Sequence, residues 1–470
     1  MGGLNAESTL EVTAHQMWRY ARGEFSHMYL FERPKTVAGQ AASSFFLIPR
    51  IFPALVVSLL CLVLHSPTAE GQNLDIGPES VTWSLVDLVQ TAVLSHPSVQ
   101  AQRETLRASE ADLRGAWWQY LPSPSIQGER VDGGNLVTMQ LTQPLWSGGR
   151  LSSGVALAEA RVEQSRWSEV QVQYQLADQV VTQYGLLMSA HVGIQIYEAY
   201  LHNLRDLERM MRRRVDQGYS AVVDAKLVAS RVSQAMGVRT TLFASRASAV
   251  GILSQLVGRQ IAANDVAEPA NSLPNGRWQE RRHVLVRMAI QTDPSLRAAS
   301  VTMDVAKAQT EQAESSLMPN IFARIRRREA LGGSSVDDET DFLIGFEFSL
   351  SGGWSSVEGV NASVAREAVA RSSRQAQLTE LTARVTTELE DYRSAAILIE
   401  ELSINRNTQQ EIFDSYTRMF LAGKRSWLDV LNVMREQLEV EKSLADARVR
   451  LATSNYRLKL STGGASWRRD

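Results

Sequence analysis

The sequence has few of the residues that carry metal and disulfide chemistry. It has one cysteine, Cys61, and 7 histidines among 470 residues. A single thiol allows no disulfide framework, and no histidines are paired at the spacing that metal ligands show, so we expect no metal site. Glycine-rich phosphate loops and Gly-x-Ser-x-Gly turns are also missing. The sequence therefore offers no catalytic residue and no cofactor site, and it predicts a protein that is not an enzyme.

An excess of charge of one sign is also lacking. The formal net charge is -2, with 21% charged and 44% hydrophobic residues. This balance is typical of a folded protein, and it lacks the bulk positive charge with which proteins attract nucleic acid. We therefore expect no nucleic-acid partner.

Long apolar runs are nearly absent, and the one that stands out extends from Ile51 to Leu64. It is shorter than the roughly 20 residues that a membrane-spanning helix needs. It follows an arginine and precedes small residues, which is the pattern of a cleaved signal peptide. We predict that residues 1–71 are an N-terminal extension and signal peptide, cleaved after Ala69 or Gly71. A membrane anchor is the alternative.

The rest of the chain contains two copies of one pattern. LVQTAVLSHPSVQA, which begins at Leu88, matches LVRMAIQTDPSLRA, which begins at Leu285. Ser-Gly-Gly motifs and single glycines then recur in the same order in both halves. Self-similarity of this kind is the signature of an internal repeat. We predict repeats over residues 72–272 and 273–470.

Each copy predicts a helix, a β-hairpin, a very long helix, a tight turn and a further helix. Pro122 and Pro319 end the first helix of each copy, because proline cannot continue a helix. Alternating sequence then indicates strands, in hairpins at about 123–146 and 320–350. In FLIGFEFSL, from Phe342, large apolar residues alternate with small or polar ones. This suits either a half-buried soluble sheet or a wall between lipid and water.

The stretches Gly149–Gly218 and Gly353–Gly423 lack proline and consist mostly of helix-forming residues. At ~1.5 Å per residue, each predicts a rod on the order of 100 Å long. Apolar residues in the second stretch recur at close to seven-residue spacing, which indicates coiled-coil packing. These are Leu378, Leu381, Val385, Tyr392, Ala395, Ile399 and Leu402.

Glycines occupy the predicted changes of chain direction. Gly218 and Gly423 suit left-handed caps that close the two helical hairpins. The strand-to-helix bends are expected at two further pairs of glycines. These are Gly148, Gly149, Gly352 and Gly353.

Two strands per copy give four per chain, too few to close a membrane barrel, whose edges cannot stay unpaired in lipid. Three chains would supply twelve strands, which lies within the range of known barrels. The predicted fold is therefore an α+β membrane protein. In such an assembly the matching long helices would extend the tube away from the membrane.

These features resemble the TolC family of outer-membrane factors over Leu85 to Gly463. The resemblance rests on the doubled order of elements, on QPLWSGGR, and on the turn sequences DQGYSAVVDAKL and LAGKRSWLDVLN. It implies a homotrimer in the outer membrane lipid of a Gram-negative bacterium, with its helical part in the periplasm. The trimer would combine a 12-stranded outer-membrane β-barrel with a long α-helical coiled-coil barrel. It also implies two partners: a periplasmic adaptor protein and an inner-membrane ABC transporter or efflux pump.

The resemblance further implies roles for the two tip turns. The turns Gly218-Tyr219-Ser220 and Gly423-Lys424-Arg425 match those that dock the adaptor. Arg425 matches the arginine that holds the inner helix pair shut, and Asp224 matches its acidic partner. Asp429 matches an aspartate that rings the constriction, whereas the next ring position, commonly acidic, is Asn432 here. Ordinary solvated charges beside a turn are the alternative.

The stretch from Gly423 to Leu451 is similar to the branch of the family that serves type I secretion, including agglutination proteins linked to adhesin export. We therefore predict an exit duct that passively conducts cargo, such as a large adhesin or other protein. The alternative is the outer-membrane component of a small-molecule or drug efflux pump, because the same tube serves both. A third interpretation is a periplasmic coiled-coil adaptor or scaffold.

Overall fold

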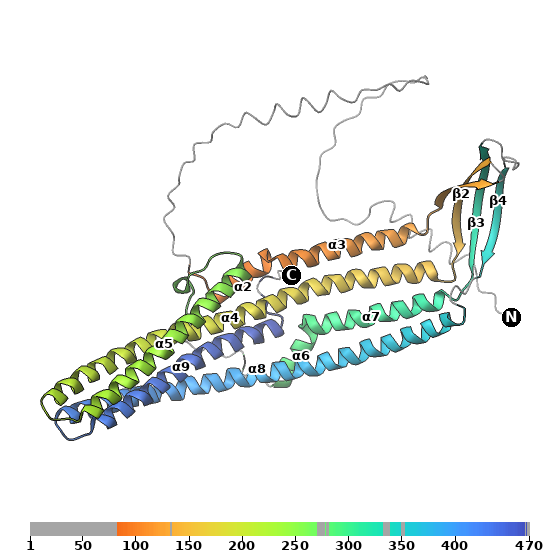
Figure 1. The fold of residues 1–470 in the computed structure, drawn as a ribbon. Helices are drawn as coiled ribbons and strands as arrows, with labels where there is room; N and C mark the ends of the chain where they lie inside the picture. Colours follow the sequence, from red (N-terminus) through yellow and green to blue (C-terminus); the bar gives the residue numbers. More distant parts are fainter. Residues whose placement is uncertain are drawn as a thin grey trace, which may run out of the picture. The chain divides into compact units, whose positions relative to one another are not determined.

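The computed structural model describes residues 82–131, 134–269, 278, 282–331, 339–348, 353–465 and 467 (Figure 1). The chain divides into two compact units, Met1–Ile76 and Gly77–Asp470, and every described residue belongs to the second. The predicted extension and signal peptide, and the repeat boundary near residue 272, lie outside the described residues.

The described elements occur in the same order twice. The first series is α2 (Leu85–Ser95), α3 (Pro97–Trp118), β1 (Ser123–Val131), β2 (Gly134–Trp146), α4 (Arg150–Asp216), α5 (Val222–Val257) and η1 (Ala263–Asp265). The second is α6 (Arg282–Thr292), α7 (Pro294–Ser315), β3 (Asn320–Leu331), β4 (Glu339–Glu347), α8 (Ser355–Leu421) and α9 (Trp427–Ser461). The predicted order of helix, hairpin, long helix and helix is therefore confirmed. A break before α3 and α7 divides the first helix in two.

That break is capped by different side chains in the two repeats. His96 Nδ1 accepts the backbone N–H of Ser98 at 3.2 Å, and Asp293 Oδ1 accepts that of Ser295 at 3.0 Å. A proline follows each cap at the first helical position, where its missing N–H costs no hydrogen bond. An imidazole and a carboxylate thus start equivalent helices.

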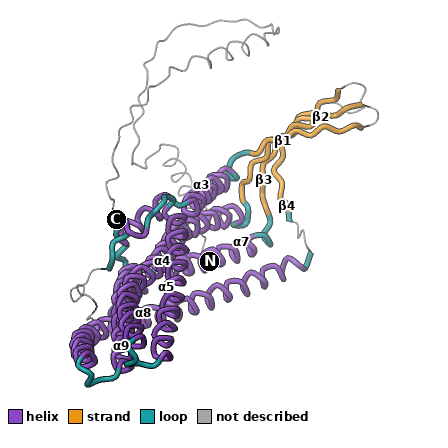
Figure 2. The backbone as a smooth tube through the Cα atoms, turned by 60° about the vertical axis from the view of Figure 1, so that its left-hand side comes forward, coloured by secondary structure: helices purple, strands orange, loops and turns teal. Residues whose placement is uncertain are grey.

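The two long helices are equal in length, at 67 residues each. A rise of 1.5 Å per residue makes each about 100 Å long. Toward the sheet, the neighbouring helices run in the order α3, α4, α7, α8; toward the other end, the order is α5, α4, α9, α8 (Figures 1 and 2). The long helices therefore belong to both rows and connect the two ends of this unit.

Apolar contacts between neighbouring helices of these rows form the core. Leu88 and Leu285, which match in the sequence repeat, are 0% and 1% exposed. Each buried leucine of this kind contributes about 1.5–3 kcal/mol through removal of apolar surface from water. The predicted coiled-coil stripe of α8 packs in the same apolar cluster as Leu285, with its central members buried. These are Leu381, Val385, Tyr392 and Ala395.

The four strands form one antiparallel sheet in the order β1-β2-β3-β4. The pairing of β2 with β3 joins the two repeats, and β1 and β4 are the sheet edges. The strands of the two hairpins lie within 123–146 and 320–347, and residues 132–133, 332–338 and 349–352 lie outside the described part. Among the helices of the described part, none has the length and apolar character that crossing a membrane requires.

Candidate functional site: an amphipathic sheet and two helix tips

One face of the sheet is mostly apolar and uncovered, except that Arg327 and Glu329 of β3 form an ion pair on it at 3.8 Å. The strand register places Ile126 beside Met139, and Ile325 beside both Leu141 and Phe342. On β4, the side chains of Phe342, Ile344 and Phe346 are 68%, 66% and 78% exposed. A half-buried soluble sheet would cover these side chains, so the described contacts favour the lipid-facing alternative.

The opposite face is polar and carries a ladder of arginines. Arg324, Arg326 and Arg328 alternate along β3. Arg326 Nη2 donates to Asp341 Oδ2 at 2.6 Å, and Arg328 pairs with both Asp341 and Glu339. The sheet therefore has a mostly apolar face and a hydrogen-bonded charged face, which suits a wall between lipid and water. The sequence shows arginines at every second position from 324 to 328. Their ion pairs depend on the strand register, which the sequence does not show.

Exposed tryptophans mark the passage from sheet to helices. Trp118 precedes β1, Trp146 ends β2 and Trp354 precedes α8; their side chains are 72%, 49% and 85% exposed. Indole rings favour the boundary between lipid and water, because one end is apolar and the other can donate a hydrogen bond. The position of these rings suits such a boundary.

Left-handed glycines lie between the sheet and the long helices. Gly148 and Gly149 have φ of 60° and 91°, and Gly353 has φ of 59°. A Cβ on Gly148 would stand 2.1 Å from the Cβ of Met318, whereas a Cβ on Gly353 would meet nothing within 4 Å. Gly352 lies outside the described residues. Gly148 is therefore crowded, whereas Gly353 and its match in the first repeat, Gly149, have room for a Cβ among the described residues.

The two helix tips share one backbone design. After α4, the N–H of Gly218 donates to the carbonyl of Val215 at 3.0 Å, and that of Tyr219 to Arg214 at 2.7 Å. After α8, Gly423 and Lys424 donate to Phe420 and Met419 at 3.0 and 2.8 Å. These paired bonds form the Schellman motif, which requires a left-handed residue; Gly218 and Gly423 have φ of 78° and 71°.

The two candidate gate aspartates begin the descending helices. Asp224 Oδ2 accepts the N–H of Ala221, and Asp429 Oδ2 accepts that of Ser426, each at 3.3 Å. Both therefore occupy the third position of a helix, where a carboxylate caps the first turn and complements the helix dipole. Within this one chain, the two equivalent aspartates therefore each cap the start of a helix.

Arg425 pairs within its own hairpin. Its Nη1 lies 3.7 Å from Asp429 Oδ2, and its guanidinium stacks 4.6 Å from the ring centre of Tyr416. Within the described part of this one chain, no ion pair joins Arg425 to Asp224. Arg425 is exposed, as is Tyr219 of the first tip, at 73%. Their side chains are available to a neighbouring molecule.

Asn432, the second candidate ring position, lies one turn beyond Asp429. It is exposed and lines a cavity of about 140 Å³ between α4, α5 and α9. Tyr197 and Tyr200 of α4 contribute to the same cavity, together with Arg231 and Arg435. Asn432 is neutral, so it adds no second carboxylate beside Asp429.

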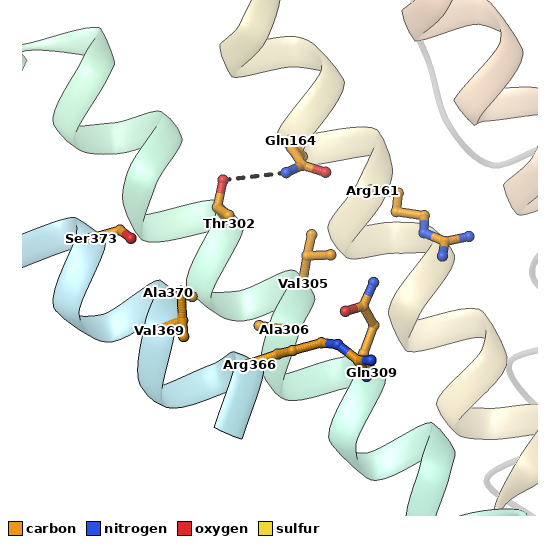
Figure 3. A pocket seen from close by; sticks show the side chains of 10 residues that line it. All are labelled: Arg161, Gln164, Thr302, Val305, Ala306, Gln309, Arg366, Val369, Ala370 and Ser373. Carbon is orange, nitrogen blue, oxygen red and sulfur yellow. Dashed lines mark hydrogen bonds between the residues drawn. The ribbon is translucent and has the colours of Figure 1, made fainter. Parts of the chain in front are cut away.

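A larger cavity of about 380 Å³ opens where α4, α7 and α8 run side by side (Figure 3). Gln164 of α4 donates to Thr302 of α7 at 3.2 Å across it. Arg161 and Arg366 also line it, and each is the twelfth residue of its long helix. The repeat therefore brings two equivalent arginines to one groove.

An arginine clasp, absent from the sequence-based predictions, joins three helices. Arg457 of α9 donates to Asp178 at 2.8 Å and to Thr182 at 2.8 Å, both on α4, and its Nη1 lies 3.5 Å from Glu388 of α8. Burial raises the pKa of Glu388, and Arg457 opposes that rise. Only the tertiary structure brings these residues together, so no sequence pattern marks the clasp.

Among the described residues, no group of three or more His, Cys, Asp or Glu side chains is placed to hold a metal ion.

Comparison with known proteins shows which family and which solved structures the chain is similar to. A family model described as "Outer membrane efflux protein" matches residues 88–259 and 285–464. No sequence relative among the curated proteins matches the chain.

Several solved structures share the fold. The outer-membrane channel OprN is 19% identical, with a TM-score of 0.70 over 82% of this chain and 92% of its own. VceC from Vibrio cholerae is 14% identical, with a TM-score of 0.69 over 81% and 96%. The CmeC channel from Campylobacter jejuni is 12% identical, with a TM-score of 0.67 over 82% and 87%.

Proposed function

The chain belongs to the outer membrane efflux protein family, and from this premise we propose that it is the exit duct of a tripartite export system. The structures that share its fold include outer-membrane channels, and channels conduct rather than catalyse. In this role the chain passively conducts cargo from an inner-membrane transporter to the exterior.

The amphipathic sheet is the observation that carries this proposal. Phe342, Ile344 and Phe346 suit contact with lipid, and the arginine ladder on the other face suits a water-filled lumen. The edges β1 and β4 need partners, because an unpaired strand edge is too costly in lipid. Three chains joined edge to edge would close a barrel of twelve strands.

The helices supply matching lateral surfaces for such a homotrimer. Helices α5 and α8 lie at opposite ends of one row and both expose large apolar side chains. On α5 these include Met236 and Phe243; on α8 they include Ile397 and Ile404. Within the chain, the long helix α4 of the first repeat contacts the short helix α7 of the second. The equivalent contact in a trimer would join the long helix α8 of one chain to the short helix α3 of the next. Lateral association would cover the apolar side chains.

The helix tips would then lie in the periplasm, about 100 Å from the sheet. They offer Tyr219, Lys424 and Arg425 to a periplasmic adaptor protein, and an inner-membrane ABC transporter or efflux pump would complete the path. We propose Arg425, with Asp224 of a neighbouring hairpin, as a latch, and Asp429 as a ring of three carboxylates. Such a ring would attract cations and repel anions.

Two kinds of cargo suit the same tube. The similarity of Gly423–Leu451 to the type I secretion branch supports export of a large adhesin or other protein. The alternative is small-molecule efflux. Deletion of the gene should abolish surface display of the adhesin under the first proposal, and should raise susceptibility to toxic small molecules under the second.

Cell fractionation followed by conductance measurement tests the duct itself. We expect the protein in the outer-membrane fraction, migrating as a heat-modifiable trimer, and single-channel steps from the purified protein in a planar bilayer. A folded trimer that never conducts would contradict the duct and favour an adaptor or scaffold. Recovery as a soluble monomer would contradict the membrane sheet.

A further inference from the structure

Arg324 differs from the other two arginines on the polar face of the sheet. Arg326 and Arg328 are neutralised by Asp341 and Glu339, but Arg324 forms no ion pair with any residue that the structure describes. It is half-buried. Arg324 thus carries a positive charge that no described residue neutralises, although Glu347, opposite Asn320, lies on the same face of the sheet.

The guanidinium of Arg324 is held in place on two sides. Its Nε donates to the hydroxyl of Thr142 on β2 at 3.2 Å, and its Cζ lies 4.5 Å from the ring centre of Phe322. Phe322 in turn covers Gly345, where an added Cβ would stand 2.9 Å from Phe322 Cζ. The glycine therefore leaves room for the ring on which the arginine stacks.

This arrangement leaves the two terminal nitrogens of Arg324 without a described partner. A guanidinium presents its terminal donors as a planar fork that fits a carboxylate. Because the fork is already oriented by Thr142 and Phe322, less side-chain freedom is lost when an anion binds. The site is thus built for a planar oxyanion.

The position of Arg324 along β3 adds to this. Strand β3 begins at Asn320, directly after α7, so Arg324 is the arginine of the ladder nearest the helices. In the proposed duct, cargo that leaves the helical tunnel would meet Arg324 before Arg326 and Arg328. After passing Glu347, the cargo would meet the free arginine of the ladder before the two neutralised ones.

We propose that Arg324 is a cargo-contacting residue that transiently binds carboxylate groups at the entrance to the lumen of the sheet. The proposal rests on the proposed function, because it requires the polar face to line a conduit. The carboxylate can belong to a small organic anion or to an acidic side chain of an exported polypeptide. Three copies of Arg324 would surround the path.

The test uses the purified full-length protein in a planar bilayer, with benzoate and pentaglutamate as probes. We expect at least one of these two anions to reduce the current of the unaltered channel. Neutral benzamide should not reduce it. Arg324→Gln should weaken that block about tenfold, because a charge-assisted hydrogen bond is lost. Arg324→Lys should restore part of it, since it keeps the charge without the fork.

The matched control is the double variant Arg326→Gln, Asp341→Asn, which removes an ion pair from the same face at constant net charge. It should be blocked like the unaltered channel. Every variant is first checked for heat-modifiable migration as a trimer. Block by benzoate alone identifies small anions as the source of the carboxylate, and block by pentaglutamate alone identifies polypeptides.

Two results would overturn the assignment of Arg324. One is a conducting channel that neither probe blocks. The other is a block that persists unchanged in Arg324→Gln. Both leave the duct intact, whereas an unaltered trimer that forms no channels would refute the proposed function itself, so the two failures are distinguishable.

Discussion

The helix tips of the two repeats have the same backbone design and different exposed side chains. Gly218 and Gly423 close the helix tips with the same paired hydrogen bonds, and Asp224 and Asp429 cap the helices that follow. The side chains beside these devices have diverged: the first tip exposes Tyr219, and the second exposes cations. The comparison shows that the positions fixed by backbone conformation are shared, while the chemistry presented to partners is specific to each copy.

The largest expected effect separates a crowded glycine, Gly148, from an open one, Gly353, which matches Gly149 in the repeat. Gly148→Ala should prevent trimer formation or cost roughly 3 kcal/mol or more, because the new Cβ adds a clash with Met318 to a left-handed φ. Gly353→Ala should cost only about 1–2 kcal/mol, because its surroundings are open. Thermal unfolding in detergent and heat-modifiable migration measure both; equal losses would refute the distinction.

The clasp at Arg457 should matter more than an ordinary surface pair. Arg457→Met removes the partner of Glu388, whose side chain is only 14% exposed, and should cost about 1–3 kcal/mol. The control is Arg107→Met, which breaks the Arg107–Glu104 pair on α3; both side chains are exposed, at 73% and 67%, so we expect about 0–1 kcal/mol. Denaturant unfolding compares the two variants, and a larger loss at Arg107 would contradict the clasp.

The tips allow a test of function with little effect on stability. Arg425→Ala should change stability by at most about 1 kcal/mol, because its pair with Asp429 is exposed. We expect larger, still cation-preferring conductance steps, since three latches would be lost together. Tyr219→Ala, at the first tip, is the control and should leave the step size unchanged. Unaltered steps in Arg425→Ala would refute the latch and preserve the duct.

The smallest expected effect concerns pH. Burial raises the pKa of Glu388 above the ordinary 4.5, although Arg457 and Arg384 lower it and Asp391 and Asp178 raise it further. A carboxyl whose pKa is raised by folding stabilises the folded state below its unfolded pKa, and that contribution is lost as pH rises through the folded pKa. Stability should therefore fall slightly above pH 4.5.

The equivalent position in α4 is Gln183, so Glu388→Gln makes the two repeats alike there. In this variant the pH dependence over that range should flatten. Unfolding curves of both proteins across pH provide the measurement. An identical pH dependence would show that other groups cause it.

Sequence alone predicted the elements well where local chemistry decides them. The prolines at 122 and 319, the glycines of the tips and the alternation in β4 each act within a few residues, so helix ends, turns and strands follow from them. The ion pairs of Arg326 and Arg457 were not predictable, because their partners depend on strand register and helix packing. The pairing of Arg425 with Asp224 remains a prediction, because it concerns a neighbouring hairpin.

The equal length of α4 and α8 constrains how this protein can change in evolution. Both helices have 67 residues, so both tips end at the same depth below the sheet. A one-residue deletion in α4 alone would rotate its tip by about 100° and shorten it by about 1.5 Å relative to that of α8. Insertions and deletions in the rods should therefore survive only as matched pairs, one per repeat, and homologues should differ in rod length by such pairs.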